Sequence, residues 1–268
     1  MTLTLSWRGP LESCNYACGY CPFATRPARA RVLAADRAAL DRFVAWVKAA
    51  GRPLRVRLVP YGEAMVHPWY PAALGRLASF PHVEAVSIQT NGSSRPAPIA
   101  GPADKVTLWV SYHPTETALG PLLARLAAWR ALGVRVAVGA VAEPAHRAAI
   151  EALAAALPEG RLWLNAKKPG VRYGPAEVAA WAALDPDFAL DARPLRSRGV
   201  ACGAGETGLL VDGAGTLRRC VLVADSLGNL YTDDLDAVLR PRACPRATCT
   251  CWLGYSQRTD VVRTTERA

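Results

Sequence analysis

Strand-like and helical segments alternate along the first two-thirds of the chain, and this alternation constrains the fold most. Six short apolar segments are predicted strands: Thr2–Trp7, Leu54–Val59, Val83–Gln89, Val106–Ser111, Val134–Val141 and Leu162–Asn165. Apolar residues at helical spacing predict helices over Ala34–Ala49, Trp69–Ser79, Thr117–Leu132, Pro144–Leu157 and Pro175–Leu184. Strands joined by helices pair in parallel through right-handed crossovers. We therefore expect an α/β fold, and the count of six suits a partial (β/α)6 TIM-like barrel.

Three cysteines, Cys14, Cys18 and Cys21, follow the first predicted strand in the run Cys-Asn-Tyr-Ala-Cys-Gly-Tyr-Cys. Three thiolates on one short loop can bind three irons of a cubane [4Fe–4S] cluster and leave the fourth iron without a protein ligand. The next cysteine is the distant Cys202. An open metal position is typical of catalytic sites. A zinc site is the alternative, although zinc motifs pair two close ligands with two distant ones.

The spacing Cys-x3-Cys-x2-Cys, with Tyr20 before the third cysteine, resembles the signature of the radical SAM superfamily. The resemblance implies that Cys14, Cys18 and Cys21 are catalytic, because they would hold a [4Fe–4S] cluster whose open iron binds S-adenosylmethionine. It implies reductive cleavage of this cofactor to a 5′-deoxyadenosyl radical, which abstracts hydrogen from a substrate carbon. The protein's part would be to position cofactor and substrate and to exclude water.

Two further motifs follow the second and third predicted strands, where barrel enzymes place their reactive groups. Gly62 and Glu63 resemble the family's Gly-Gly-Glu segment, whose backbone and carboxylate contact the amino group of S-adenosylmethionine. Tyr61 replaces the first glycine of that segment. Thr90 and Asn91 resemble a Thr-Asn-Gly tripeptide that lines the cofactor pocket in relatives, although any tight turn uses the same residues.

The last three predicted strands end in polar or small residues. Ser111 and His113 lie where relatives place polar side chains near the ribose or carboxylate of the cofactor; His113 could instead be a general base, a substrate contact or a surface histidine. Gly139 lies where family members pack a glycine against the adenine. The sixth strand ends in residues that could face the substrate or bind a carboxylate, namely Asn165, Lys167 and Lys168.

The alternation of predicted strands and helices ends after the sixth strand and its helix. The Pro- and Arg-rich stretch Asp185–Gly199 reads as a linker, so we expect a barrel over residues 1–195 and a small cysteine-rich extension over residues 196–268. Within the extension, Gly208–Val211 and Thr216–Arg219 flank a turn and predict a β-hairpin.

Five cysteines lie in the extension: Cys202, Cys220, Cys244, Cys249 and Cys251. The spacing Cys-x12-Gly-x4-Cys resembles the SPASM and twitch extensions of radical SAM proteins, which bind auxiliary iron–sulfur clusters. Five cysteines suffice for one auxiliary [4Fe–4S] cluster, held by Cys202, Cys220 and two of the other three. A zinc knot is the alternative. In either case the metal would stabilise a segment too small for a core of its own.

Composition bears on location and partners. The chain has no run of eighteen apolar residues and no basic start followed by an apolar stretch, so we expect neither a membrane span nor a secretory signal. Tight cysteine clusters without such a signal favour metal binding in the cytoplasm over disulfides. The net charge of +10 would suit nucleic acid, but the basic residues are scattered and not interleaved with aromatic residues. A nucleic-acid partner is therefore not expected.

The hypothesis from sequence is a radical SAM enzyme with one auxiliary cluster. Because family members with such tails often modify ribosomally made peptides, a peptide is the first expected substrate, although no amino-terminal extension resembles a leader-binding domain. A small molecule is the second expected substrate. The family also implies an electron donor of the flavodoxin or ferredoxin type. The alternatives are an RNA-modifying radical SAM enzyme and a non-catalytic metal-binding module.

Overall fold

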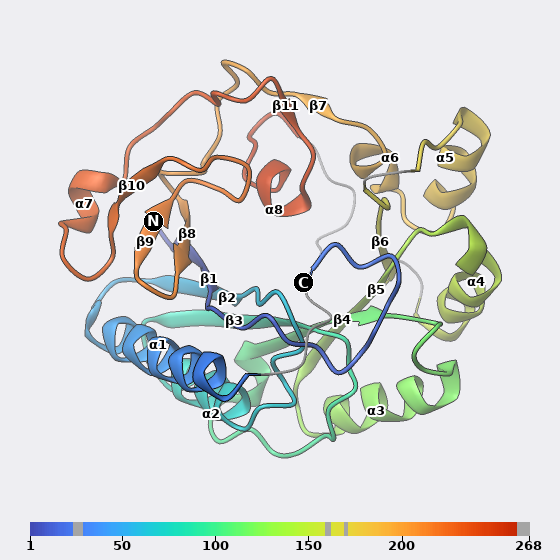
Figure 1. The fold of residues 1–268 in the computed structure, drawn as a ribbon, viewed down its shortest axis with the longest axis horizontal. Coiled ribbons are helices and arrows are strands. Elements are labelled where there is room, and N and C mark those ends of the chain that lie inside the picture. The colour runs from blue at the N-terminus through green and yellow to red at the C-terminus, as the bar shows by residue number, and fades with distance from the viewer. Residues whose placement is uncertain (24–28, 159–161, 169–170, 262–268) are drawn as a thin grey trace.

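A curved nine-stranded sheet forms the centre of the protein (Figure 1). The computed structural model describes all 268 residues except 24–28, 159–161, 169–170 and 262–268. Six consecutive parallel strands make up most of the sheet: β1 (Leu3–Arg8), β2 (Leu54–Leu58), β3 (Val83–Thr90), β4 (Val106–Tyr112), β5 (Arg135–Val141) and β6 (Leu162–Asn165). Among the described residues nothing pairs β6 with the far edge, so the barrel stays open. The predicted partial barrel is confirmed.

Five helices follow one another around the outer side of the sheet (Figure 1). They are α1 (Ala30–Ala49), α2 (Trp69–Ala78), α3 (Leu119–Ala131), α4 (Arg147–Ala156) and α5 (Pro175–Ala182). All five were predicted, with small differences at their ends. The largest is at α1, which begins at Ala30 rather than at the predicted Ala34, and a 3₁₀ turn, η2 (Pro144–His146), precedes α4. A second such turn, η1 (Ala103–Lys105), leads into β4.

None of the helices in the described part of the chain is long and apolar enough to cross a bilayer.

Alternation along the strands separates the hydrophobic core from the interior of the barrel. On β4, Leu108 and Val110 face the helices and belong to the core, whereas Trp109 and Ser111 line an interior cavity. Successive side chains of a strand point to opposite faces, so one strand serves both surfaces. The outer helices complete the core, and α1 contributes Leu40, Phe43, Val44 and Val47.

The predicted hairpin of the extension is confirmed, and it continues the barrel sheet. Strand β8 (Gly208–Asp212) pairs in parallel with β1, from Thr4 opposite Gly208 to Arg8 opposite Asp212. Strands β9 (Thr216–Arg218) and β10 (Ser226–Asn229) then add antiparallel neighbours. The first strand is therefore flanked on both sides, which holds the cysteine loop that follows it between two halves of one sheet.

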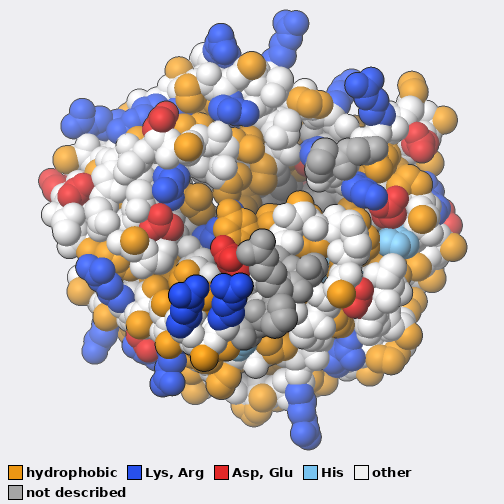
Figure 2. All heavy atoms as spheres, in the orientation of Figure 1, with side chains coloured by type: hydrophobic (Ala, Val, Ile, Leu, Met, Phe, Trp, Pro, Cys, Tyr) orange, Lys and Arg blue, Asp and Glu red, His pale blue; other side chains and the backbone are white. Residues whose placement is uncertain are grey.

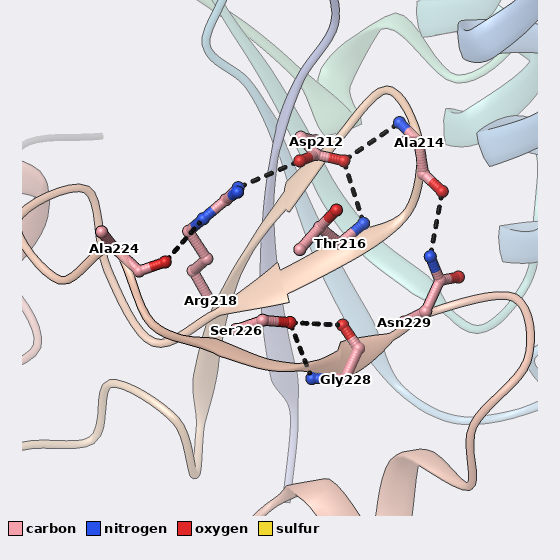
Figure 3. A network of polar contacts seen from close by, with 8 residues as sticks. All are labelled: Asp212, Ala214, Thr216, Arg218, Ala224, Ser226, Gly228 and Asn229. Atoms are coloured by element: carbon pink, nitrogen blue, oxygen red, sulfur yellow. Dashed lines mark hydrogen bonds and ion pairs between the residues drawn. The ribbon is translucent and has the colours of Figure 1, made fainter.

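A polar network fixes the turn of this hairpin (Figure 3). The Asp212 carboxylate accepts hydrogen bonds from the backbone N–H groups of Ala214, at 3.0 Å, and Thr216, at 2.9 Å, and it pairs with Arg218. Burial alone would raise the pKa of Asp212, but these hydrogen bonds outweigh it and lower the pKa below its usual value. The Asn229 amide closes the turn by donating to the Ala214 carbonyl.

The prediction of a linker over Asp185–Gly199 is wrong. This segment contains α6 (Phe188–Asp191) and β7 (Leu195–Arg196), and β7 pairs with β11 (Thr248–Cys249). Asp185 accepts the backbone N–H of Leu164 at 2.7 Å, and Asp191 accepts that of Ala166 at the same distance. The two carboxylates are buried because they replace the missing strand partner at the open edge of β6. Two short helices, α7 (Leu235–Val238) and α8 (Trp252–Tyr255), complete the extension.

Candidate active site

A cavity of about 520 Å³ opens at the carboxyl ends of the parallel strands. Figure 2 shows this face hollowed near its middle, with mainly hydrophobic side chains around the hollow. Cys14, Cys18 and Cys21 line the cavity. The structure brings all six predicted cofactor-binding residues into the same wall: Gly62, Glu63, Thr90, Asn91, Ser111 and His113. Nine residues from the carboxyl ends of four strands and from the loops that follow them thus meet at one rim, as barrel geometry requires.

Glu63 is a buried carboxylate whose hydrogen bonds lie within the protein. It is 1 % exposed and accepts hydrogen bonds from the backbone N–H of Met65 (2.9 Å), the hydroxyl of Thr90 (2.7 Å) and the backbone N–H of Asn91 (2.5 Å). Burial raises its pKa, and the three donors oppose that shift. The carboxylate therefore ties the end of β3 to the loop after β2. Its predicted contact with the cofactor's amino group stays a prediction.

Asn91, which donates to Glu63 through its backbone, also contacts the cysteine loop through its side chain. Its side-chain amide donates to the Cys14 sulfur at 3.7 Å and to the Asn15 side-chain oxygen at 3.0 Å. The backbone N–H of Tyr16 also donates to the Cys14 sulfur, at 3.4 Å. Burial raises the pKa of Cys14, while these donors favour its thiolate form. Glu63, Asn91 and Cys14 thus form one hydrogen-bonded chain.

Gly62 is required by the cysteine loop itself. A Cβ at this position would lie 1.8 Å from the carbonyl oxygen of Ser13, and the backbone N–H of Glu63 donates to the same oxygen at 3.0 Å. Gly62 does not have a positive φ. The chain that approaches this glycine closely is the segment just before Cys14.

The three thiols favour a cationic ligand. Burial, together with the negative charges of Glu116, Cys21 and Cys14, raises the pKa of Cys18 to about 11. Thiols whose pKa values are raised, as those of Cys14 and Cys18 are, form thiolates when a bound metal cation compensates the negative charge. This donor set fits a [4Fe–4S] cluster, since a cubane places each thiolate on a separate iron. Among the described residues, no three His, Cys, Asp or Glu side chains converge on a single metal ion.

His113 orients the aromatic residue of the cysteine motif. Its Nδ1 and the Tyr20 hydroxyl are 2.8 Å apart and share a hydrogen bond, and the two rings stack at 5.8 Å. Burial lowers the pKa of His113 to about 4, so the imidazole is neutral at neutral pH. Glu116, which the sequence did not single out, accepts the backbone N–H of Ala17 and holds the other side of the loop.

The cysteines of the extension separate into two groups. Four of them line a second, small cavity: Cys202, Cys220, Cys244 and Cys249. Cys251 instead lines the large cavity, together with the three cysteines of the amino-terminal motif. All eight cysteines lie in the described part of the chain, and no disulfide joins any of them.

Arg219 holds the chain segment that forms one side of the second cavity. Its guanidinium is buried and donates to the carbonyls of Ala243, at 2.7 Å, and Arg242, at 2.8 Å, which positions the segment just before Cys244. Burial, with a smaller contribution from the Cys220 and Cys251 thiols, raises the pKa of Cys249 to about 11. Burial also raises the pKa of Cys220, so Cys220 and Cys249 favour a bound metal cation for the same reason as Cys14 and Cys18.

The inner wall of the barrel contains a tryptophan pair that sequence reasoning missed. The ring centroids of Trp109 on β4 and Trp163 on β6 lie 5.9 Å apart, and both residues line the large cavity. Between them, Gly139 leaves room for the Trp163 indole, because a Cβ there would meet the ring at 2.0 Å. The glycine expected to pack against adenine is therefore covered by a side chain of this protein. The alternation of β6 could have placed Trp163 in the cavity, but not the contact with Gly139.

Comparison with known proteins agrees with this geometry. No protein-family model matches the chain, and no curated protein matches it. Solved structures do match. The fold is similar to that of anSMEcpe. A structure of native anSMEcpe with bound AdoMet has a TM-score of 0.58 and 13% sequence identity, covering 88% of this chain and 80% of that one.

A second anSMEcpe structure, with bound AdoMet and the Kp18Cys peptide, gives a TM-score of 0.57 at 13% identity and covers 89% of this chain and 80% of that one. A third anSMEcpe structure, with AdoMet and the Cp18Cys peptide, has a TM-score of 0.55 at 14% identity and covers 89% of this chain and 80% of that one. At these identities the likeness establishes the fold. The fold that the resemblance to the radical SAM superfamily implies is thus confirmed.

Proposed function

We propose that this protein is a radical SAM enzyme. The observation that supports the proposal most is that Cys14, Cys18 and Cys21 line one cavity together with all the residues that the sequence assigned to the cofactor. The fold adds support, because the anSMEcpe structures with which it is shared hold AdoMet. A metal-binding module without catalysis would not need a cavity of about 520 Å³ beside its cysteines.

In this proposal Cys14, Cys18 and Cys21 hold the catalytic [4Fe–4S] cluster. When bound, the cluster supplies an electron for the reductive cleavage of S-adenosylmethionine, and the resulting radical removes hydrogen from a substrate carbon. Asn91 donates to the Cys14 sulfur and stabilises the thiolate. Glu63 fixes Asn91, and two further polar residues of the wall, Ser111 and His113, are available to orient the nucleotide.

The extension, residues 196–268, would hold an auxiliary [4Fe–4S] cluster on Cys202, Cys220, Cys244 and Cys249. Their shared cavity supports this choice among the five cysteines. Only three residues separate the fourth ligand, Cys249, from Leu253 in the wall of the large cavity. An auxiliary cluster in this position could accept an electron from a substrate radical or bind the substrate directly.

A peptide is the proposed substrate. The support is that two of the similar structures contain peptides together with AdoMet. A small molecule is the second candidate, since the cavity is about as large as those that bind single metabolites. A flavodoxin- or ferredoxin-type protein would donate the electron.

The proposal is tested by reconstituting the protein anaerobically with iron and sulfide and adding dithionite and S-adenosylmethionine. We expect 5′-deoxyadenosine and methionine in equal amounts by mass spectrometry. Cys18→Ala should abolish both, and Glu84→Gln, far from the cavity, should not. An intact cluster that releases no 5′-deoxyadenosine would contradict the proposal, and bound zinc without iron would favour the metal-binding module.

A further inference from the structure

Arg8, the last residue of β1, brings a positive charge into the large cavity. Successive side chains of a strand point to opposite faces of the sheet, and Leu5 and Trp7 belong to the hydrophobic core. Arg8 therefore faces the interior of the barrel, where it lines the same cavity as the three cysteines that follow it in the chain. Strand β1 thus delivers both the guanidinium and the cysteine loop to one cavity.

Two contacts hold the Arg8 guanidinium in place. Its Nε donates to the backbone carbonyl of Val59 at 2.8 Å. Its central carbon lies 4.3 Å from the centre of the Tyr61 ring, in a cation–π contact. Tyr61 occupies the position of the first glycine in the Gly-Gly-Glu pattern, and a glycine would leave the guanidinium without this support.

The two terminal nitrogens of Arg8 are available to a ligand. A guanidinium has five N–H groups, and the hydrogen bond to Val59 uses one of them. Nη1 and Nη2 have no hydrogen-bond or ion-pair partner among the described residues. Neither of them belongs to the polar atoms that this part of the chain buries without a partner, so both are accessible. A planar pair of donors of this kind matches the two oxygens of a carboxylate.

The other two cations of the described cavity wall already have acidic partners. Lys167 forms an ion pair with Glu143, and Lys168 forms one with Asp191. The two lysines were expected to bind a carboxylate, and their ion pairs remove the reason for that expectation. Arg8 has no such partner among the described residues. An anion that enters the cavity is therefore attracted most strongly to Arg8.

Exposed aromatic rings lie beside this charge. The Phe23 ring lies 5.4 Å from the Tyr61 ring, and the two residues are 51 % and 39 % exposed. Both line the cavity with Arg8. Exposed apolar surface at a cavity is typical of a binding site. A single guanidinium among apolar rings balances the single charge of a carboxylate, but it leaves half the charge of a phosphate dianion uncompensated.

We infer that Arg8 and Tyr61 form a subsite for a carboxylate of the substrate. Nη1 and Nη2 donate to the two carboxylate oxygens, and the rings of Tyr61 and Phe23 contact the apolar atoms that carry the group. The carboxylate is either the carboxyl terminus of a chain or an acidic side chain. This inference rests on the proposed function, because it defines which part of a substrate the cavity holds beside the cofactor.

The test measures binding, not turnover. The reconstituted protein, with S-adenosylmethionine and without reductant, is titrated by ligand-observed NMR with two matched pairs of probes. The first pair is N-acetylleucine and N-acetylleucinamide, and the second is the N-methylamides of N-acetylglutamate and N-acetylglutamine. The carboxylate of at least one pair should bind about tenfold more tightly than its neutral partner, as expected for hydrogen bonds to a charged group.

The pair that shows this preference identifies the source of the carboxylate. Preference in the first pair indicates a carboxyl terminus, and preference in the second indicates an acidic side chain. Equal affinities within both pairs, or no binding of any probe, overturn the inference.

Variants locate the binding. Arg8→Gln should remove the preference for the carboxylate, and Tyr61→Gly, which removes the ring under the guanidinium, should weaken the best probe about threefold. Arg76→Gln is the matched control, because Arg76 lies on the outer helix α2 and pairs with Asp41 at the surface. It should change the affinity less than twofold.

A preference that persists in Arg8→Gln overturns the inference. So does a loss of affinity for S-adenosylmethionine with an unchanged preference among the probes, because Arg8 would then serve the cofactor. If Arg8→Gln does not fold, Tyr61→Gly and the comparison of the probes on wild-type protein still decide. Release of 5′-deoxyadenosine from the wild-type preparation tests the proposed function separately.

Discussion

Replacement of Glu63 by glutamine should both destabilise the fold and disturb the catalytic loop. The carboxylate accepts three hydrogen bonds, and all three partners are donors. Glutamine has one oxygen and one amino group. If the oxygen takes the place that accepts from Met65 and Thr90, the amino group faces the backbone N–H of Asn91, where the two heavy atoms of the present hydrogen bond are 2.5 Å apart. One donor is then left buried and unpaired.

The expected cost follows from that geometry. Loss of one hydrogen bond to a buried charged group costs about 1.5–3 kcal/mol, and a stranded buried donor costs about 1–3 kcal/mol more. We expect destabilisation by about 3 kcal/mol, which corresponds to a fall in melting temperature of about 6–12 °C for a chain of this size. The matched control is Glu84→Gln, because Glu84 is exposed and pairs with Arg55 at the surface. That change should cost less than about 1 kcal/mol.

Thermal unfolding followed by circular dichroism measures the stability, and iron analysis follows the cysteine loop in the same samples. Because Asn91 donates to Cys14, the Glu63→Gln variant should also lose iron more readily on treatment with chelator than the control does. A melting temperature within 2 °C of the wild type would show that the carboxylate does not position Asn91, and the account of the hydrogen-bonded chain would fail.

Three further predictions test other parts of the structure. Gly62→Ala should prevent iron loading at the amino-terminal loop because its Cβ would overlap the backbone of that loop, whereas Gly120→Ala, which meets no atom within 4 Å, should not. Reconstituted protein should contain about eight irons; Cys244→Ser should lose about four of them and Cys251→Ser none, as iron analysis can show. Between pH 6.5 and 4 the folded state disfavours protonation of buried His113, whose pKa is about 4, so stability falls as the pH falls. The melting temperature should therefore drop more from pH 7 to pH 5 in the wild type than in His113→Gln; equal drops would contradict this.

Much of the barrel could be predicted from the sequence because its information is local. Each βα unit has its own periodicity, and the carboxyl end of each strand places the next motif at the same rim. For this reason residues as distant in sequence as Cys14 and His113 could be assigned to one site. Both residues line the same cavity in the structure. The spacing of the cysteines also carries chemistry that does not depend on the exact fold.

The remaining features depend on contacts between distant segments. Pairing of β8 with β1 joins residues about two hundred positions apart, and no periodicity signals it. Asp185 and Asp191 lie in the segment that was interpreted as a linker, but they are buried because they cap the open edge of β6. Cys249 and Cys251 differ by two positions and would share a face on a continuous strand, but β11 ends at Cys249. The chain then turns, and the two thiols enter different cavities.

Electron paramagnetic resonance of the reduced protein tests the central claim most directly. With S-adenosylmethionine labelled with ¹⁵N and ¹⁷O at its amino and carboxylate groups, the catalytic cluster should show hyperfine coupling to both nuclei, because the iron without a protein ligand would bind them. The measurement is best made on Cys244→Ser protein, in which we expect only the cluster on Cys14, Cys18 and Cys21. A reduced cluster on these cysteines with no coupling to either label would contradict the account.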